Sequence, residues 1–191
     1  MSEEPLLFDL PEQIETGRLI LRPPQAGDGA ATHAAVCDSL AELRAWPANL
    51  PWAVPEPTIA ASETFCRKGQ AQFLLRTSLI FLIFERLTGQ MVGVCSLHKI
   101  DWPTRRCEVG FWGRSGTHGR GYLSEALRAL TALAIAPPIS ARRLELFTDA
   151  RNHRARALAE RVGFRFEGVM RDYCVEPDGT RRDLAVYGLV P

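Results

Sequence analysis

A glycine-rich segment near the middle of the chain, Gly116–Tyr122, has the residue types that most directly suggest chemistry. It reads Gly-Thr-His-Gly-Arg-Gly-Tyr and leads into an apolar stretch whose leucines and alanines recur every three or four residues between Leu123 and Ala134. The first N–H groups of a helix have no partner within the helix, and the helix dipole favours an anion beside them. The segment therefore predicts a phosphate-binding loop at the start of a helix.

A half-buried strand is predicted immediately before this loop. Two sets of side chains alternate there with a period of two, namely Cys107, Val109 and Phe111 on one face and Glu108, Gly110 and Trp112 on the other. Pro137 and Pro138 end the helix that follows the loop. The predicted order is strand, glycine loop, helix.

Two common phosphate-binding motifs fit this order poorly. A P-loop requires Gly-Lys-Ser/Thr at its end, but Tyr122 and Leu123 stand where Lys and Ser/Thr must be. A dinucleotide fingerprint requires Gly-x-Gly-x-x-Gly/Ala in a parallel βαβ unit. Here Ser124 occupies the third small position, and the upstream strands are typical of an antiparallel meander.

The loop resembles the acetyl-CoA pyrophosphate loop of the GNAT acetyltransferase superfamily, usually written Gln/Arg-x-x-Gly-x-Gly/Ala. Gly116 departs from the first position of that motif, which removes a side-chain contact but keeps the backbone amides. Three further stretches follow the order of the family, namely Arg18–Arg22, Glu108–Trp112 and Asn152–Phe164. Together they resemble the RimJ/RimL-type branch, whose members acetylate ribosomal-protein N-termini or small amines, over about residues 14 to 190.

The resemblance implies an α/β fold of the α+β kind: a mixed, mostly antiparallel central sheet, helices on both faces, and a splayed strand pair that holds the cofactor. It implies acetyl-CoA as co-substrate, with pantetheine using main-chain groups of the first splayed strand as an added strand would. Asn152 would contact pantetheine, and a simple helix N-cap is its structural alternative. The implied cofactor-binding residues are Phe111, Trp112, Gly113, Gly116, Thr117, His118, Gly119, Arg120, Gly121, Tyr122, Leu123 and Asn152.

Acetyl transfer to an amine also needs a proton acceptor, because an α-amino group has a pKa of about 7.7 to 8 and a lysine about 10.4. Glu108 is the predicted general base, directly or through water, since it matches the glutamate of the family's Glu-x-Gly-Phe/Tyr-Trp. A structural carboxylate is the alternative. The general acid stays unassigned: Ala159 stands where many GNAT proteins have a tyrosine, and Tyr173, His118 or water could replace it.

The five cysteines are odd in number and widely spaced, without metal-binding spacing. They predict reduced, mostly buried thiols in a cytoplasmic protein that holds no metal. A relay through Cys95 or Cys107 is an alternative to direct transfer. The formal net charge of +1 argues against a nucleic-acid partner. The apolar run 79–84 is too short to cross a membrane and predicts a central strand.

The chain is predicted to form one domain, residues 14–191, after an N-terminal tail at residues 1–13 that Pro5 and Pro11 keep irregular. Helices are expected at 28–46, 58–75, 123–136 and 152–163, and strands at 18–22, 79–86, 90–98, 106–112, 143–148, 164–175 and 182–190.

The sequence indicates less about the acceptor amine than about the cofactor. Trp46 and Trp52 flank a proline-rich stretch in the region that covers the acceptor in RimJ/RimL-like proteins, and they predict a substrate-binding lid. A loop packed by its own aromatic residues is the alternative. The predicted activity is N-acetylation of a primary amine, foremost the N-terminal α-amino group of a protein or peptide. The alternatives are a small amine (polyamine, amino acid or antibiotic) or a non-catalytic CoA-binding sensor, and a homodimer is compatible with the sequence.

Overall fold

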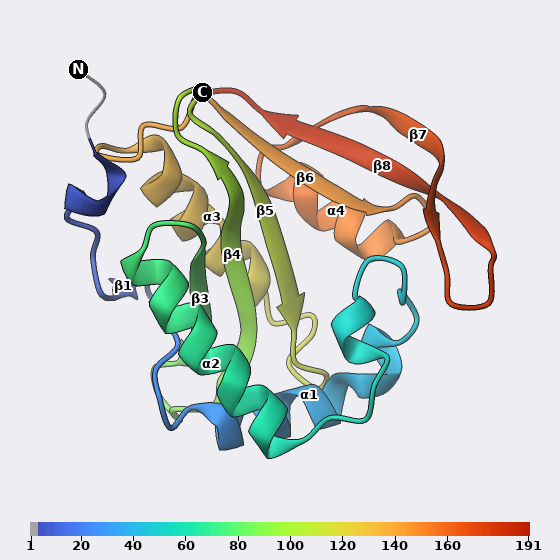
Figure 1. Ribbon diagram of the computed structural model, residues 1–191, viewed down its shortest axis with the longest axis horizontal. Coiled ribbons are helices and arrows are strands. Elements are labelled where there is room, and N and C mark those ends of the chain that lie inside the picture. The colour runs from blue at the N-terminus through green and yellow to red at the C-terminus, as the bar shows by residue number, and fades with distance from the viewer. Residues whose placement is uncertain (1–3) are drawn as a thin grey trace.

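The computed structural model describes residues 4–191, and an eight-stranded sheet runs through its centre (Figure 1). The strand order is β1-β2-β3-β4-β5-β6-β8-β7, with β5 and β6 parallel and all other neighbours antiparallel. The predicted mixed, mostly antiparallel sheet is confirmed. Its strands are β1 (Ile14–Glu15), β2 (Leu19–Arg22), β3 (Leu79–Glu85), β4 (Met91–Asp101), β5 (Arg106–Gly113), β6 (Arg143–Asp149), β7 (Arg165–Val175) and β8 (Arg181–Leu189).

Helices cover both faces of the sheet. The helices α1 (Gly29–Leu43) and α2 (Ile59–Leu74) lie on one face, and α3 (Tyr122–Ile135) and α4 (His153–Arg161) lie on the other (Figure 1). The predicted positions of all four hold to within a few residues. Two short 3-10 helices, η1 (Pro5–Leu7) and η2 (Pro51–Ala53), lie outside the sheet.

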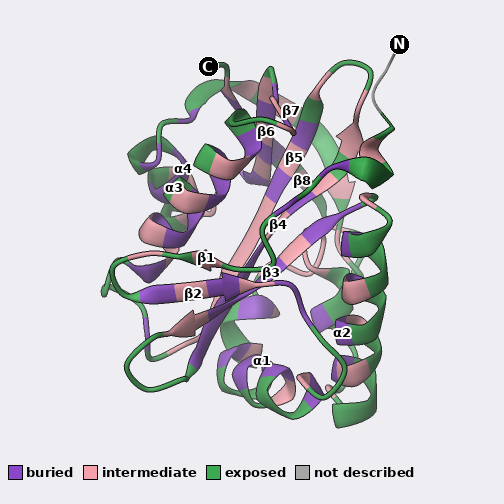
Figure 2. Cartoon of the chain, turned by 90° about the vertical axis from the view of Figure 1, so that its left-hand side faces the viewer, coloured by how far each residue is buried: buried purple, intermediate pink, exposed green. Residues whose placement is uncertain are grey.

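Burial on both faces of the sheet explains why the sequence of β3 is apolar throughout. Alternate side chains pack on opposite faces: Leu79, Phe81 and Ile83 join the cluster that contains the leucines of α3, and Ile80, Leu82 and Phe84 join the cluster beside α1 and α2. A strand covered on both faces reads as a continuous apolar run rather than an alternating one. In Figure 2 the buried positions lie along the central strands, whereas the outer surfaces of α1 and α2 are exposed.

The N-terminal segment expected to be an irregular tail contains a short helix and contacts the domain through two buried side chains. Pro5–Leu7 forms η1, because the fixed φ of proline suits the first position of a short helix. Phe8 and Leu10 are buried, and the Phe8 ring lies edge-on to Trp102 with 5.4 Å between ring centroids. Residues 1–3 of the predicted tail lie outside the described residues.

An ion pair between β2 and the start of α1 anchors that helix. Two nitrogens of Arg22 donate hydrogen bonds of 2.7 Å to the carboxylate of Asp28, and the N–H of Gln25 donates a third of 2.7 Å. Burial raises the pKa of Asp28, but these hydrogen bonds outweigh it, so the pKa lies below its ordinary value. The ionised pair therefore stabilises the folded state.

We expect Asp28→Asn to lower the free energy of unfolding by about 2 kcal/mol at neutral pH, because it removes charge-assisted hydrogen bonds. Since the folded pKa is lowered, this stability is present above the unfolded pKa of about 3.9 and is lost as pH falls through the folded value. Urea denaturation near pH 7 and near pH 2 measures both limits. Glu56→Gln, which alters an exposed pair with Arg44, is the control. An Asp28→Asn effect that is equally large at both pH values would contradict this account.

The parallel pair β5 and β6 is joined only at one end. Its register pairs are Arg106 with Arg143, Cys107 with Leu144, and Glu108 with Glu145. Beyond Glu108 the described residues of the two strands form no further pairs, although β5 continues to Gly113. The two strands diverge along this stretch (Figure 1). The predicted splayed strand pair is thus present, with Glu108 at the point of divergence.

Candidate active site

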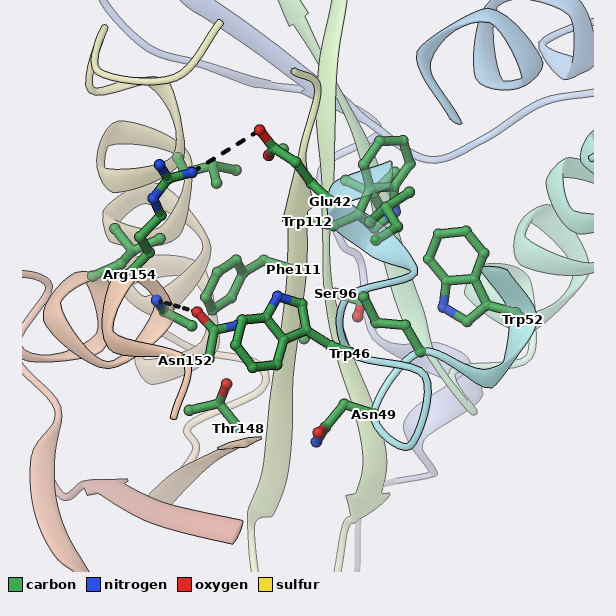
Figure 3. Close-up of a pocket in the computed structure, with 18 of the residues that line it drawn as sticks. Glu42, Trp46, Asn49, Trp52, Ser96, Phe111, Trp112, Thr148, Asn152 and Arg154 are labelled. Carbon is green, nitrogen blue, oxygen red and sulfur yellow. Dashed lines mark hydrogen bonds and ion pairs between the residues drawn. The ribbon is translucent and has the colours of Figure 1, made fainter. Parts of the chain in front are cut away.

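A cavity of about 2110 Å³ occupies the space where β5 and β6 diverge. Its walls include the glycine loop before α3 and the segment between α1 and α2 that contains Trp46 and Trp52. Figure 3 shows Trp46 and Trp52 on one side of β5 and Asn152 on the other, around Phe111 and Trp112. The fold therefore brings the predicted cofactor and acceptor regions to one continuous space.

The glycine loop has the backbone geometry of an anion site. Gly119 and Gly121 have φ values of 77° and 78°, in the left-handed region that glycine adopts without strain. Among residues 4–191, the N–H groups of Gly119, Arg120 and Gly121 have no hydrogen-bond acceptor, and Gly121 caps α3 without a side-chain bond. The side chain of Arg18 stabilises the loop by donating a 2.8 Å hydrogen bond to the carbonyl of Arg120. Free amides at a helix start favour a phosphate.

Most of the predicted cofactor residues lie on the cavity wall, and two do not. Gly116 and Arg120 do not line the cavity, and both are exposed. The backbone carbonyl of Arg120 instead accepts the hydrogen bond from Arg18 that stabilises the loop. The predicted residues that line the cavity are Phe111, Trp112, Gly113, Thr117, His118, Gly119, Gly121, Tyr122, Leu123 and Asn152.

Several of these side chains stabilise the loop itself. The buried hydroxyl of Thr117 donates a 2.6 Å hydrogen bond to the carbonyl of Arg114. Nδ1 of His118 lies 3.2 Å from the carboxylate of Glu42 on α1. The hydroxyl of Tyr122 donates to Glu85 on β3. The first contact lies within the loop, and the other two fix it and the start of α3 against α1 and β3, which restricts the orientation of the loop's amides.

The end of β5 offers a free backbone edge to an extended ligand. Phe111, Trp112 and Gly113 pair with β4 on one side, and β6 has diverged on the other. Across the gap, Oδ1 of Asn152 accepts a 3.1 Å hydrogen bond from the N–H of Ala155 and caps α4. The structural role of Asn152 is thus present, and its amide nitrogen is not used in the cap. Contact with pantetheine stays a prediction.

Glu108 lies half-buried where the strands separate, with both carboxylate oxygens engaged. Nε2 of His98 lies 3.0 Å from Oε1, and Nζ of Lys99 donates a 2.8 Å hydrogen bond to Oε2. A bulge in β4 lets these consecutive side chains reach the same carboxylate: the register shifts after His98, and Lys99 has a φ of 48°. Burial raises the pKa of Glu108, but the hydrogen bonds from His98 and Lys99 lower it by more, so the carboxylate is ionised and weakly basic.

The two strand cysteines are poorly suited to a nucleophilic relay. Cys95 and Cys107 are buried, and neither lines the cavity. Burial raises the pKa of both thiols, and raises that of Cys107 to about 12 with a further contribution from Glu145. A thiol that stays protonated is a weak nucleophile. Direct transfer is therefore favoured over a covalent cysteine intermediate.

The predicted acceptor-binding part of the cavity is rich in tryptophan. The Trp52 ring lies 5.9 Å from that of Trp112 on β5, and the guanidinium of Arg151 lies 5.7 Å from the Trp46 ring. Trp52 is 47% exposed despite its size. Asn49, between the two predicted lid residues, has a buried Oδ1 without a partner among the described residues. A buried, unpaired acceptor on a cavity wall suits a ligand N–H group.

The family model described as an acetyltransferase (GNAT) domain matches residues 18–165. The chain belongs to the GNAT acetyltransferase family. The family, its α/β fold and its co-substrate, acetyl-CoA, are as expected from the glycine loop. The match begins at Arg18, which supports the loop, and it includes the cavity-lining parts of β5, α3 and α4.

Relatives and solved structures agree with this assignment. YdaF of Bacillus subtilis (strain 168) is 32% identical to this GNAT chain over 102 residues, or 53% of the chain and 55% of YdaF. The ribosomal-protein-serine acetyltransferase of Escherichia coli (strain K12) is 29% identical over 92 residues, 48% of the chain and 50% of that protein. The matches thus span about half the length of these relatives. The structure of RimL, a ribosomal L7/L12 alpha-N-protein acetyltransferase, in complex with coenzyme A shows the same fold, with a TM-score of 0.80 and 23% sequence identity. The match covers 94% of this chain and 98% of the RimL chain.

Three cavity residues of this GNAT protein were missed by the sequence reasoning. Ser96 and His98 interrupt the apolar sequence of β4 at alternate positions, a pattern that could have indicated a polar patch on one face. The sequence around Asn49 shows no such pattern, because Asn49 stands out only through its buried Oδ1, which lacks a hydrogen-bond donor among the described residues. Within residues 4–191, the structure contains no cluster of three or more metal-ligating side chains. Nor is any helix in this part long and apolar enough to cross a membrane.

Proposed function

We propose that this protein is an acetyl-CoA-dependent N-acetyltransferase that acetylates a primary amine, foremost the N-terminal α-amino group of a protein or peptide. One observation carries the proposal: a single cavity joins the free amides of the glycine loop to the tryptophan-lined segment, with Glu108 along its wall. A phosphate at the glycine loop and an amine beside the tryptophan-lined segment would bring a thioester and its acceptor together at the divergence of β5 and β6.

The preference for a protein N-terminus is supported by the relatives and by the cavity. The names of the Escherichia coli relative and of RimL describe acetylation of ribosomal proteins. The cavity is open enough for an extended chain to enter, and the unpaired Oδ1 of Asn49 can accept a peptide N–H. A small amine, such as a polyamine, amino acid or antibiotic, is the alternative acceptor.

In the proposed reaction each part of the site has a separate task. The amides of Gly119 to Leu123 hold the pyrophosphate, and the free edge of β5 from Phe111 to Gly113 holds pantetheine. A main-chain N–H of this edge stabilises the oxyanion of the tetrahedral intermediate. The negative charge of Glu108 drives removal of the amine proton. We place the reaction in the cytoplasm, consistent with the free cysteines, and propose neither a nucleic-acid nor a membrane partner.

Release of CoA thiol tests the proposed function directly. The purified protein is mixed with acetyl-CoA and a panel that includes peptides with different first residues, the same peptides with blocked N-termini, polyamines and amino acids. Turnover with free but not blocked peptides is the expected result. Turnover confined to small amines would replace the acceptor. Binding of CoA without turnover on any acceptor would support a sensor instead.

Trp52→Ala is expected to raise the KM for the acceptor about tenfold, because truncating a large aromatic contact costs on the order of 1.4 kcal/mol. The affinity for CoA should remain near that of the parent, since the Trp52 ring contacts Trp112 of β5 and leaves the backbone amides of the glycine loop unchanged. Steady-state kinetics with varied acceptor and calorimetry with CoA measure the two values. Trp52→Phe, which keeps an aromatic ring, is the matched control and should recover most of the loss. An unchanged acceptor KM in Trp52→Ala would contradict the lid.

A further inference from the structure

Three side chains on the cavity wall form a chain of hydrogen bonds. Oγ of Ser96 lies 3.3 Å from Nδ1 of His98, and Nε2 of His98 lies 3.0 Å from Oε1 of Glu108. Ser96 and His98 are two residues apart on β4 and share a face, and His98 pairs with Glu108 across β4 and β5. Gly110 makes room for the ring, since a Cβ at this position would lie 2.8 Å from Cε1 of His98.

The chemistry of the three groups determines which of them donates each hydrogen bond. An ionised carboxylate only accepts hydrogen bonds, so Nε2 of His98 must carry the proton that it shares with Glu108. In a neutral imidazole the other nitrogen, Nδ1, is then an acceptor. Ser96 therefore donates its hydroxyl proton to Nδ1, which leaves the lone pairs of Ser96 Oγ free on a residue that lines the cavity.

Glu108 itself is poorly placed to take a proton first. His98 engages one of its oxygens and Lys99 the other. The lowered pKa of Glu108 also means that its carboxylate holds a proton weakly. Such a carboxylate is better suited to stabilise a neighbouring imidazolium than to act as the base.

We propose that His98 is the proton acceptor of the transfer reaction, reached from the amine through the hydroxyl of Ser96, with Glu108 as the positioning residue behind it. The inference rests on the proposed function and specifies how its proton is removed. As the amine nitrogen bonds to the thioester carbon, its proton passes to Ser96 Oγ, and the Ser96 proton passes to His98 Nδ1. The C–S bond then breaks, water protonates the CoA thiolate, and the imidazolium returns its proton to water.

The charged surroundings of His98 suit this role. Glu108 on β5 and Glu145 on β6 are negative, and Lys99 on β4 is positive. Tyr173 on β7 also lines the cavity. Glu145 is itself paired with Arg143 at 2.8 Å, whereas Glu108 contacts His98 directly. An imidazolium at residue 98 therefore has one direct anionic partner.

The tautomer of His98 gives a test that needs no turnover. Ring ¹⁵N chemical shifts of the labelled full-length protein distinguish a protonated from an unprotonated imidazole nitrogen. We expect the Nε2–H form in the neutral ring. In Glu108→Gln the side-chain amide can donate to Nε2, so the proton should move to Nδ1. A parent protein in which Nδ1 carries the proton would overturn the relay.

Kinetics test the same relay in the working enzyme. The acceptor for the pH profiles is an O-alkylhydroxylamine, because it stays unprotonated across neutral pH and the fall in rate then belongs to the enzyme. His98→Gln should lower kcat/KM about 100-fold, as expected for loss of a general base, and remove the fall in rate at acidic pH. Ser96→Ala should lower the rate while keeping that fall. CoA affinity should be unchanged in both.

His33→Gln on α1 is the matched control, because His33 does not line the cavity, and it should keep the parent's profile. A His98→Gln variant that keeps both the rate and the acid limb of the parent would overturn the inference. A parent that turns over no acceptor would instead count against the proposed function, and the tautomer measurement would still decide the role of His98.

Discussion

Gly121→Val is expected to weaken the binding of CoA about 100-fold or more, which corresponds to the loss of about 3 kcal/mol of charge-assisted hydrogen bonds. Gly121 has a φ of 78°, which a β-branched residue does not adopt without strain, so the backbone must rotate. Rotation turns the free amides of Gly119 and Gly121 away from the pyrophosphate. Titration calorimetry with CoA measures the change in affinity.

Gly179→Val is the control for this experiment. Gly179 has a similar φ of 84°, but it lies in the turn between β7 and β8 and does not line the cavity. It should cost stability without a comparable loss of CoA affinity. Equal affinities in the parent and Gly121→Val would mean that the loop does not hold the pyrophosphate.

Glu108→Gln is expected to lower kcat by about 100-fold or more, since general-base assistance typically contributes at least that factor. A neutral amide cannot stabilise an imidazolium at His98, and it also leaves Lys99 without its carboxylate. Thiol release measures kcat, and calorimetry with CoA verifies that the cofactor end is intact. A variant with the parent's kcat would remove Glu108 from the reaction, whether as base or as positioning residue.

The glycine loop and the central strand could be predicted because their signals are local. The positive φ values at residues 119 and 121 require glycine, which is visible in the sequence. Burial on both faces requires apolar side chains throughout β3, which is visible as an apolar run. The hairpin of β7 and β8 followed similarly from Pro177-Asp178-Gly179. In each of these elements, neighbours in sequence are enough to specify the structure.

The proton relay could not be predicted in the same way. Ser96 and His98 meet Glu108 only because of the register between β4 and β5, and Lys99 joins them only because a bulge shifts that register. The divergence of β5 from β6 likewise depends on contacts between segments far apart in sequence. The packing of Phe8 and Leu10 was missed because short apolar pairs near a terminus carry no periodic signal.

A crystal structure of the protein with CoA tests the central claim most directly. We expect the pyrophosphate oxygens within hydrogen-bonding distance of the amides of Gly119 and Gly121, pantetheine along Phe111 to Gly113, and the thiol near Ser96 and Glu108. CoA bound elsewhere, with the glycine loop unoccupied, would contradict the account.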